Sequence, residues 1–120
     1  MLNLDTHILL FLLAAELRPK ELALLEQDEE WGISGIVLWE INRLYAKKRI
    51  NLSLHDSIMY DQVARLHIWP IDLPVAWALD QLDFESDPAD MLIAATSIAY
   101  NIPLVTRDDR IRHSKIVPLA

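Results

Sequence analysis

Short apolar segments alternate with helix-like segments along the whole chain, and this alternation limits the possible fold more than any other feature. The apolar segments are bounded by acids, glycines or prolines, and the segments between them repeat apolar residues at helical spacing. Strands that alternate with helices typically form a parallel sheet covered by helices on both faces. We therefore predict an α/β fold, and the length of 120 residues suits one domain.

The individual elements follow from these patterns. The predicted strands are residues 1–5, 31–35, 67–72, 102–106 and 115–119. The predicted helices are residues 6–17, 18–30, 36–49, 53–66, 74–82 and 88–101, and residues 107–113 form a turn or a short helix. Ser53 is the expected N-cap of the fourth helix, and Pro19 lies near the start of the second.

Composition excludes several classes of protein. With 52% hydrophobic residues the chain can bury a core, so disorder is not expected. The absence of cysteine excludes disulfides, thiolate metal sites and cysteine nucleophiles, and fits a reducing, cytoplasmic location. Asp5, His7 and Glu16 interrupt the apolar N-terminal run, which argues against a signal peptide. No segment reaches the roughly 18 apolar residues that a membrane helix needs.

The net charge of −7 gives the protein no overall attraction for nucleic acid. Binding of RNA would therefore need local basic patches or bridging cations. The surplus of carboxylates could itself form a cation site.

Two acids follow predicted strands. Asp5 ends the first strand, and Asp108 lies two residues after the strand at 102–106. Ligands of open α/β sheets bind beyond the carboxyl ends of the strands, so both acids are candidate site residues. Both could equally serve as helix caps or turn residues, which aspartate does well.

Glu40 lies on the apolar side of a predicted helix, three residues after Val37 and four before Leu44. A carboxylate facing a core needs a cation, a hydrogen-bond network or a proton. The alternative is a glutamate at the edge of the apolar stripe that reaches solvent and pairs with Arg43 or Lys47.

The segment Asp87-Pro-Ala-Asp90 begins the most apolar helix of the chain. Asp87 suits the N-cap and Pro88 the first helical position, so both are explained by helix structure alone. Asp90 falls at the third helical position, where the helix dipole favours an acid, but the helix that follows is apolar nearly all round. A divalent cation with oxygen ligands would explain why Asp90 lies at the start of a buried helix.

Four segments occur in an order that resembles a known family: "LDTHILL", "WEI", "DPADMLIAATS" and "LVTRDDRI". Together they resemble the PIN-domain ribonucleases, and in particular the VapC-like toxins of type II toxin–antitoxin pairs. The resemblance implies a three-layer α/β/α sandwich with a mostly parallel central sheet, so that residues 1–120 are a single PIN-like nuclease domain. It also implies a Mg²⁺- or Mn²⁺-dependent ribonuclease, a cognate antitoxin partner, and a homodimer or larger hetero-oligomer.

The resemblance assigns roles to residues by motif. It implies four catalytic acids, which are Asp5, Glu40, Asp90 and Asp108. Of these, Asp5, Asp90 and Asp108 are expected to hold the metal, and Glu40 to be a ligand or to orient water. Thr106 and Asp87 are expected to play supporting roles. The branch often has arginine after the third acid, whereas this chain has Met91, which is expected to alter substrate contact or helix packing.

Basic residues near these acids are candidates for RNA contact: Arg43, Lys47, Lys48, Arg107 and Arg110. They could equally form a solvated helix face and an ion-paired turn.

Two other functions remain open. One is a phosphatase with Asp5 as the nucleophile, although a second aspartate two residues later is missing. The other is a PIN-like module without catalytic activity that serves in binding or regulation.

Overall fold

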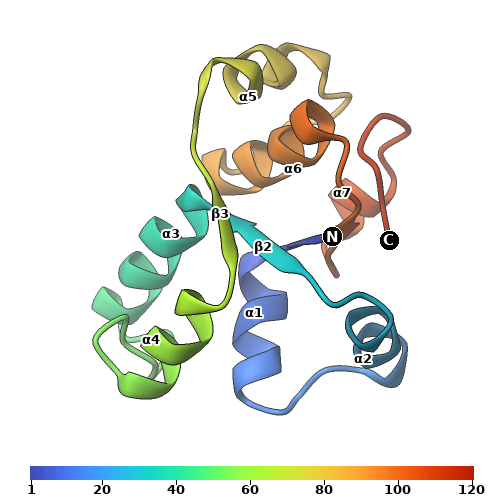
Figure 1. The fold of residues 1–120 in the computed structure, drawn as a ribbon. Coiled ribbons are helices and arrows are strands. Elements are labelled where there is room, and N and C mark those ends of the chain that lie inside the picture. Colours follow the sequence, from blue (N-terminus) through green and yellow to red (C-terminus); the bar gives the residue numbers. More distant parts are fainter.

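The structure, a computed structural model, describes residues 1–120, and its elements alternate as expected (Figure 1). The strands are β1 (Leu2–Leu4), β2 (Trp31–Ser34), β3 (His67–Trp69) and β4 (Leu104–Val105). The α-helices are α1 (Thr6–Leu13), α2 (Pro19–Glu26), α3 (Gly35–Ala46), α4 (Ser57–Ala64), α5 (Leu73–Ala78), α6 (Pro88–Tyr100) and α7 (Asp109–Arg112). A 3₁₀ turn, η1 (Leu79–Gln81), continues α5.

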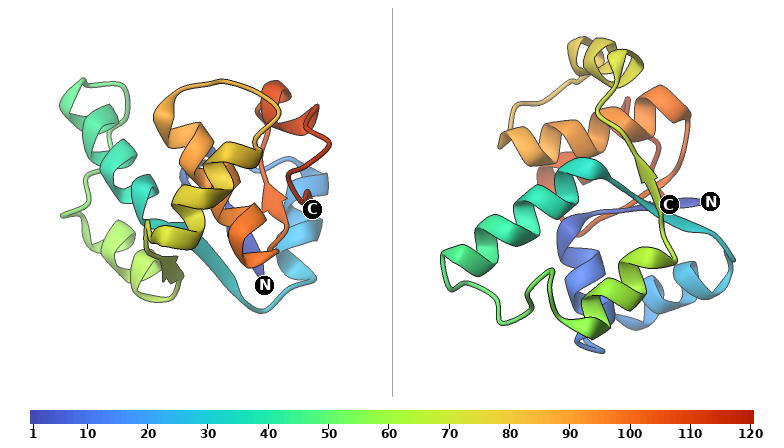
Figure 2. Two further views of the ribbon diagram at one scale, coloured as in Figure 1. Left: turned by 90° about the horizontal axis from the view of Figure 1, so that it is seen from above. Right: turned by 60° about the vertical axis from the view of Figure 1, so that its left-hand side comes forward.

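The four strands form one parallel sheet in the order β3-β2-β1-β4. Helices α5 and α6 lie on one side of this sheet, and α1, α2 and α4 lie on the other (Figures 1 and 2). The predicted α/β/α sandwich is therefore confirmed. Because all strands are parallel, their carboxyl ends lie along one edge, where β1 leads into Asp5 and β4 into Thr106.

The central strand β1 is buried along its whole length. Its Asn3 is fully buried, and the side-chain amide donates to the carbonyl of Ile93 (3.2 Å) and to the Ser97 hydroxyl (2.9 Å). Both acceptors belong to α6. These bonds hold α6 against the sheet and so help to place the acid in its first turn.

Gly32 is required by close packing between β2 and β3. A Cβ atom at this position would lie 2.5 Å from the ring of Trp69 and 2.8 Å from the carbonyl oxygen of His67. A larger residue would force the two strands apart.

Several predicted elements differ from the structure: the strand at 67–72 ends at Trp69, the helix at 6–17 ends at Leu13, and two others differ more. Helix α4 begins after Asp56, and Ser53 instead belongs to the preceding turn, where its backbone N–H donates to the Asp56 carboxylate (2.9 Å). The predicted strand at 115–119 is also wrong, since only Leu119 bridges to Leu104. Pro118 has no N–H to donate, so the pairing cannot continue along this segment. No helix has the length and the apolar character needed to cross a membrane.

Candidate active site

Asp5 is held rigidly at the carboxyl end of β1. One oxygen accepts from the backbone N–H of Thr6 (2.7 Å), which caps α1, and the other accepts from the Thr106 hydroxyl (2.6 Å). The side chain is buried with 4% exposure. Burial raises the pKa of Asp5 in spite of these bonds, and the nearby Glu40 raises this pKa further. Asp5 therefore both caps α1 and lies at the edge of the sheet where a ligand would bind.

The Thr106 hydroxyl connects two of the predicted acids. While it donates to Asp5, it accepts from the backbone N–H of Asp108 (3.0 Å). The Asp108 carboxylate in turn caps α7 by accepting from the backbone N–H of Ile111 (3.1 Å). Thr106 thus fixes the loop after β4 to the end of β1.

Asp90 occupies the first turn of α6 as predicted, and its carboxylate accepts from the Ser86 hydroxyl (2.9 Å). Burial raises the pKa of Asp90 to about 6, and repulsion from Asp5, Asp108 and Glu40 contributes to the increase. The four predicted acids therefore act on one another electrostatically, although they come from four distant parts of the sequence.

Glu40 points inward from α3, and one of its carboxylate oxygens is buried without any hydrogen-bond partner. The only ion pairs in the structure involve Asp28 and Glu21, so Glu40 does not pair with Arg43 or Lys47. Arg43 instead lies over the ring of Trp39, 4.7 Å from its centre. The ion pair that the alternative supposed is therefore absent, although the half-buried Glu40 still reaches the surface at the hollow beside it.

A hollow of about 350 Å³ lies beside Glu40, between α3 and the start of α6. We call it the Glu40 hollow, and it is lined by Trp39, Glu40, Arg43, Leu44, Lys47, Arg49, Asp87, Pro88 and Ala89. Two predicted RNA contacts, Arg43 and Lys47, thus share a cavity with a predicted catalytic acid. Lys48, whose backbone lies in the left-handed region (φ 60°), does not line it.

Asp87 occupies the predicted N-cap of α6, but its side chain makes no capping hydrogen bond. Its expected role in organising the helix start is therefore wrong at the level of the side chain. The carboxylate is exposed and faces the Glu40 hollow instead.

The acids gather around one end of the sheet without closing into a ligand set. No group of three Asp, Glu or His side chains lies close enough together to bind one ion in this conformation. The donors nevertheless suit a hard cation, because they are oxygen atoms only and include an unpartnered, buried glutamate oxygen. A cation would offset the repulsion that raises the pKa of Asp90.

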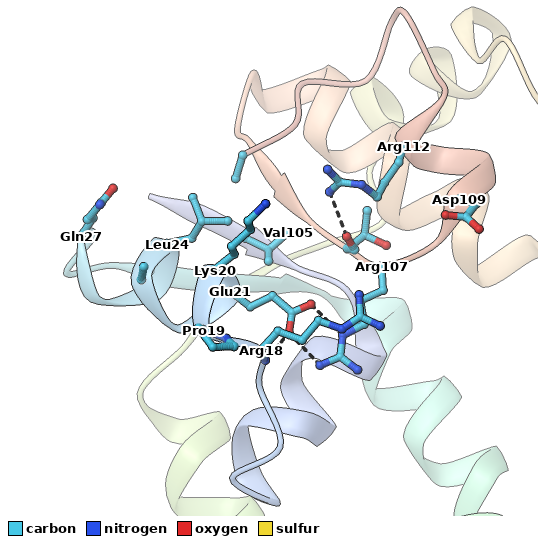
Figure 3. A pocket seen from close by; sticks show the side chains of 13 residues that line it. Arg18, Pro19, Lys20, Glu21, Leu24, Gln27, Val105, Arg107, Asp109 and Arg112 are labelled. Atoms are coloured by element: carbon cyan, nitrogen blue, oxygen red, sulfur yellow. Dashed lines mark hydrogen bonds and ion pairs between the residues drawn. The ribbon is translucent and has the colours of Figure 1, made fainter.

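Two contacts near the site have no counterpart among the sequence predictions. Ser86 orients Asp90. Glu21, buried on α2, forms a bidentate ion pair with Arg107 (2.6 and 2.7 Å), and Figure 3 shows the two side chains facing each other. Arg107 also donates to the carbonyl of Glu16 (3.1 Å) and stacks on the ring of Phe11.

These contacts bear on the predicted RNA contacts. The guanidinium of Arg107 is committed to a structural ion pair, and Arg110 donates to the carbonyl of Glu85 (2.8 Å). A pairing of residues 86 positions apart leaves no signal in local sequence. The Ser86–Asp90 spacing is local, and a serine four residues before an unexplained helix acid could have indicated it.

The arrangement can be compared with known proteins. The sequence profile described as PIN domain matches residues 3–116. The chain belongs to the PIN domain family. Among curated proteins, Ribonuclease VapC22 of Mycobacterium tuberculosis is 31% identical over 118 residues, covering 91% of this chain and 88% of that protein.

Solved structures of other protein complexes have the same fold. VapBC2 from Rickettsia felis, bound to a DNA fragment from its promoter, matches with a TM-score of 0.76 at 22% identity and covers 100% of this chain and 98% of its own. FitAcB from Neisseria gonorrhoeae matches with a TM-score of 0.71 at 25% identity, over 99% and 96% of the two chains. The predicted membership of the PIN family and its fold are confirmed.

Proposed function

We propose that this PIN-domain protein is a ribonuclease that depends on Mg²⁺ or Mn²⁺ and acts as the toxin of a toxin–antitoxin pair. The observation that carries the proposal is the group of four acids at one end of the sheet: burial raises the pKa of Asp90 to about 6, the charges of Asp5, Asp108 and Glu40 add to the increase, and one buried Glu40 oxygen has no hydrogen-bond partner. The name Ribonuclease VapC22 of a 31% identical relative supports RNA as the substrate.

A divalent cation fits the chemistry of these residues. Asp5, Asp90 and Asp108 would hold it, directly or through water, since their oxygens are hard donors at one end of the sheet. A bound cation would supply Lewis acidity and lower the pKa of a water molecule.

The other residues would prepare this site. Thr106 orients Asp5 and holds the loop that carries Asp108, and Ser86 orients Asp90. The free oxygen of Glu40 is available to accept a proton or to orient a water molecule. Arg43 and Lys47 in the Glu40 hollow would hold phosphate groups of the RNA next to the acids.

Protein partners are also part of the proposal. The structural relatives include complexes named VapBC and FitAcB and a toxin–antitoxin complex from Klebsiella pneumoniae. We infer that this chain likewise binds a cognate antitoxin and forms a homodimer or a larger hetero-oligomer. Exposed apolar side chains available for such contacts include Leu22 on α2 and Trp39 and Tyr45 on α3.

The test is cleavage of labelled single-stranded RNA by the purified protein, with Mn²⁺ and with a chelator, beside Asp5→Asn. Cleavage should require the cation and should be lost in the variant. Cleavage that continues in both the chelator and Asp5→Asn would overturn the proposal. Phospho-aspartate trapped at Asp5 would support the phosphatase instead.

A further inference from the structure

A second hollow lies outside the acids, between α2 and the loop that follows β4 (Figure 3). Its volume is about 880 Å³, more than twice that of the Glu40 hollow. We call it the α2 hollow. Its basic lining residues are Arg18, Lys20, Arg107 and Arg112, and its acidic ones are Glu21 and Asp109.

Positive charge is concentrated at the two hollows in a protein whose net charge is −7. Of its 11 Lys and Arg residues, four line the α2 hollow and three line the Glu40 hollow: Arg18, Lys20, Arg107, Arg112, and Arg43, Lys47, Arg49. Chance placement over the surface would not favour two cavities beside an acidic site. An acidic protein that binds a polyanion needs such local concentrations.

The charges in the α2 hollow are largely free to bind a ligand. Arg107 and Glu21 neutralise each other. The side chains of Arg18, Lys20 and Arg112 form no ion pair. These three cations outnumber Asp109, the remaining acidic side chain of the lining. The final residue, Ala120, also lies at the rim. Arg112 makes only one bond, to the carbonyl of Thr106 (3.3 Å), which leaves most of its guanidinium available.

Two residues connect the α2 hollow with the proposed active site. Thr106 lines the hollow, and its hydroxyl donates to Asp5. Asp109, at the rim, follows the site acid Asp108 directly. The α2 hollow therefore lies next to the residues that hold Asp5 and Asp108.

We propose that the α2 hollow is a second RNA-binding subsite, in which Arg18, Lys20 and Arg112 bind phosphates of the strand on the far side of the acids from the Glu40 hollow. The inference rests on the proposed ribonuclease function. The apolar part of the lining, which includes Leu24 and Val105, suits the ribose and base faces between phosphates. The strand would cross the acids with one basic hollow on each side.

The test compares two double variants of equal charge in the full-length protein. Arg18→Ala with Lys20→Ala removes two cations from the α2 hollow and leaves the Glu21–Arg107 ion pair intact. Arg65→Ala with Lys115→Ala removes two exposed cations that line neither hollow. Affinity for a long and a short single-stranded RNA is measured at several salt concentrations, with Asp5→Asn in every sample to prevent cleavage.

The Arg18→Ala, Lys20→Ala variant should bind the long RNA more weakly. The slope of log affinity against log salt concentration should become shallower by roughly 0.7 for each phosphate group that the protein no longer binds. This variant should leave binding of the short RNA, which spans only the acids, nearly unchanged, and the control pair should change neither. Circular dichroism and the melting temperature confirm folding. Lys20→Glu alone, on the exposed face of α2, repeats the test if the double variant unfolds.

Equal affinities of the two double variants for the long RNA would overturn the subsite, while RNA cleavage by the native protein would leave the proposed function standing. Failure of the native protein to bind or cleave any RNA would remove both. If the Arg18 and Lys20 changes weakened only the binding of a protein partner, the hollow would be a protein-binding surface and the inference would be wrong.

Discussion

At the scale of single residues, two hydroxyl groups position the carboxylates of the site. Thr106 bonds both Asp5 and the backbone of Asp108, and Ser86 bonds Asp90. The acids themselves could be predicted from sequence, because a carboxylate among apolar residues that pack into the core needs a binding partner. The hydrogen bond from Thr106 to Asp5 could not be predicted from local sequence, because it joins residues 101 positions apart and depends on the fold.

Replacing Thr106 by valine should disable cleavage. The change removes the bond to a buried Asp5 oxygen, at a cost of about 1–3 kcal/mol in the free energy of unfolding. It also frees the loop of Asp108. Cleavage assays and denaturant unfolding measure both effects. Thr106→Ser keeps the hydroxyl and should retain most activity, so a serine variant as inactive as valine would contradict this role.

The raised pKa of Asp90 predicts a specific dependence of stability on pH. Between roughly 3.9, the ordinary pKa of aspartate, and about 6, the folded protein binds more protons at this site than the unfolded chain does. Stability from this group is therefore greatest at low pH and is lost as the pH rises through about 6. Asp90→Asn should remove this loss and make the metal-free protein more stable at pH 7.

Unfolding free energies of native protein and Asp90→Asn, measured across this range with a chelator present, check the prediction. The difference between the two proteins should increase with pH. A constant difference would show that Asp90 titrates normally.

Asp87 gives a contrasting expectation. Because its side chain makes no capping bond, Asp87→Ala should cost less than the roughly 0.5–2 kcal/mol of a lost N-cap. Cleavage should be partly retained, whereas Asp90→Asn should abolish it. Melting temperatures and cleavage rates of the two variants decide the matter. Full loss of cleavage in a folded Asp87→Ala protein would assign the catalytic role to Asp87 instead.

At the scale of elements, the ion pair of Glu21 and Arg107 joins α2 to the loop between β4 and α7. Most strands and helices could be predicted, because each depends on local periodicity and capping. The strand predicted at 115–119 does not form, because its backbone pairing with β4 cannot continue at Pro118. The ion pair could not be foreseen, since it depends on how α2 packs against the sheet edge.

Glu21→Gln tests this connection. Arg107 lowers the pKa of Glu21, so the pair stabilises the fold above the ordinary glutamate pKa of roughly 4.3, and this contribution is lost as the pH falls through the lower folded value. The variant should melt at a lower temperature than native protein at pH 7. The gap should shrink in acid. A gap that stays constant with pH would show that the effect is not electrostatic.

At the scale of the whole molecule, the carboxylates of the proposed site gather at one edge of the sheet, and seven of the 11 Lys and Arg residues line the two hollows. The net charge alone argued against RNA binding, and the fold revealed how the basic residues are distributed over the surface. The Glu40 hollow was partly foreseen through Arg43 and Lys47. The α2 hollow was not, because Arg18 and Lys20 are distant in sequence from every acid of the site.

Lys47 and Lys48 are adjacent in sequence, but only Lys47 lines the Glu40 hollow, so the two can be compared directly. Lys47→Ala should weaken binding of unrelated RNAs to a similar extent, because phosphate contacts carry no sequence information. Lys48→Ala, with the same charge change one residue away but outside the hollow, should have little effect. RNA affinities of the two variants, with Asp108→Asn to stop cleavage, provide the test. Equal effects would mean that only the overall charge matters.

The central claim is that Asp5, Asp90 and Asp108 bind a divalent cation beside Glu40 and that this cation makes the protein a ribonuclease. The most direct test records RNA cleavage and the melting temperature in one Mn²⁺ titration, for native protein and Asp90→Asn. Binding to the folded state should raise the melting temperature of native protein, cleavage should rise over the same concentrations, and the variant should lose both responses. A higher melting temperature without cleavage would indicate a metal-binding module, and cleavage that persists in Asp90→Asn or without the cation would contradict the account.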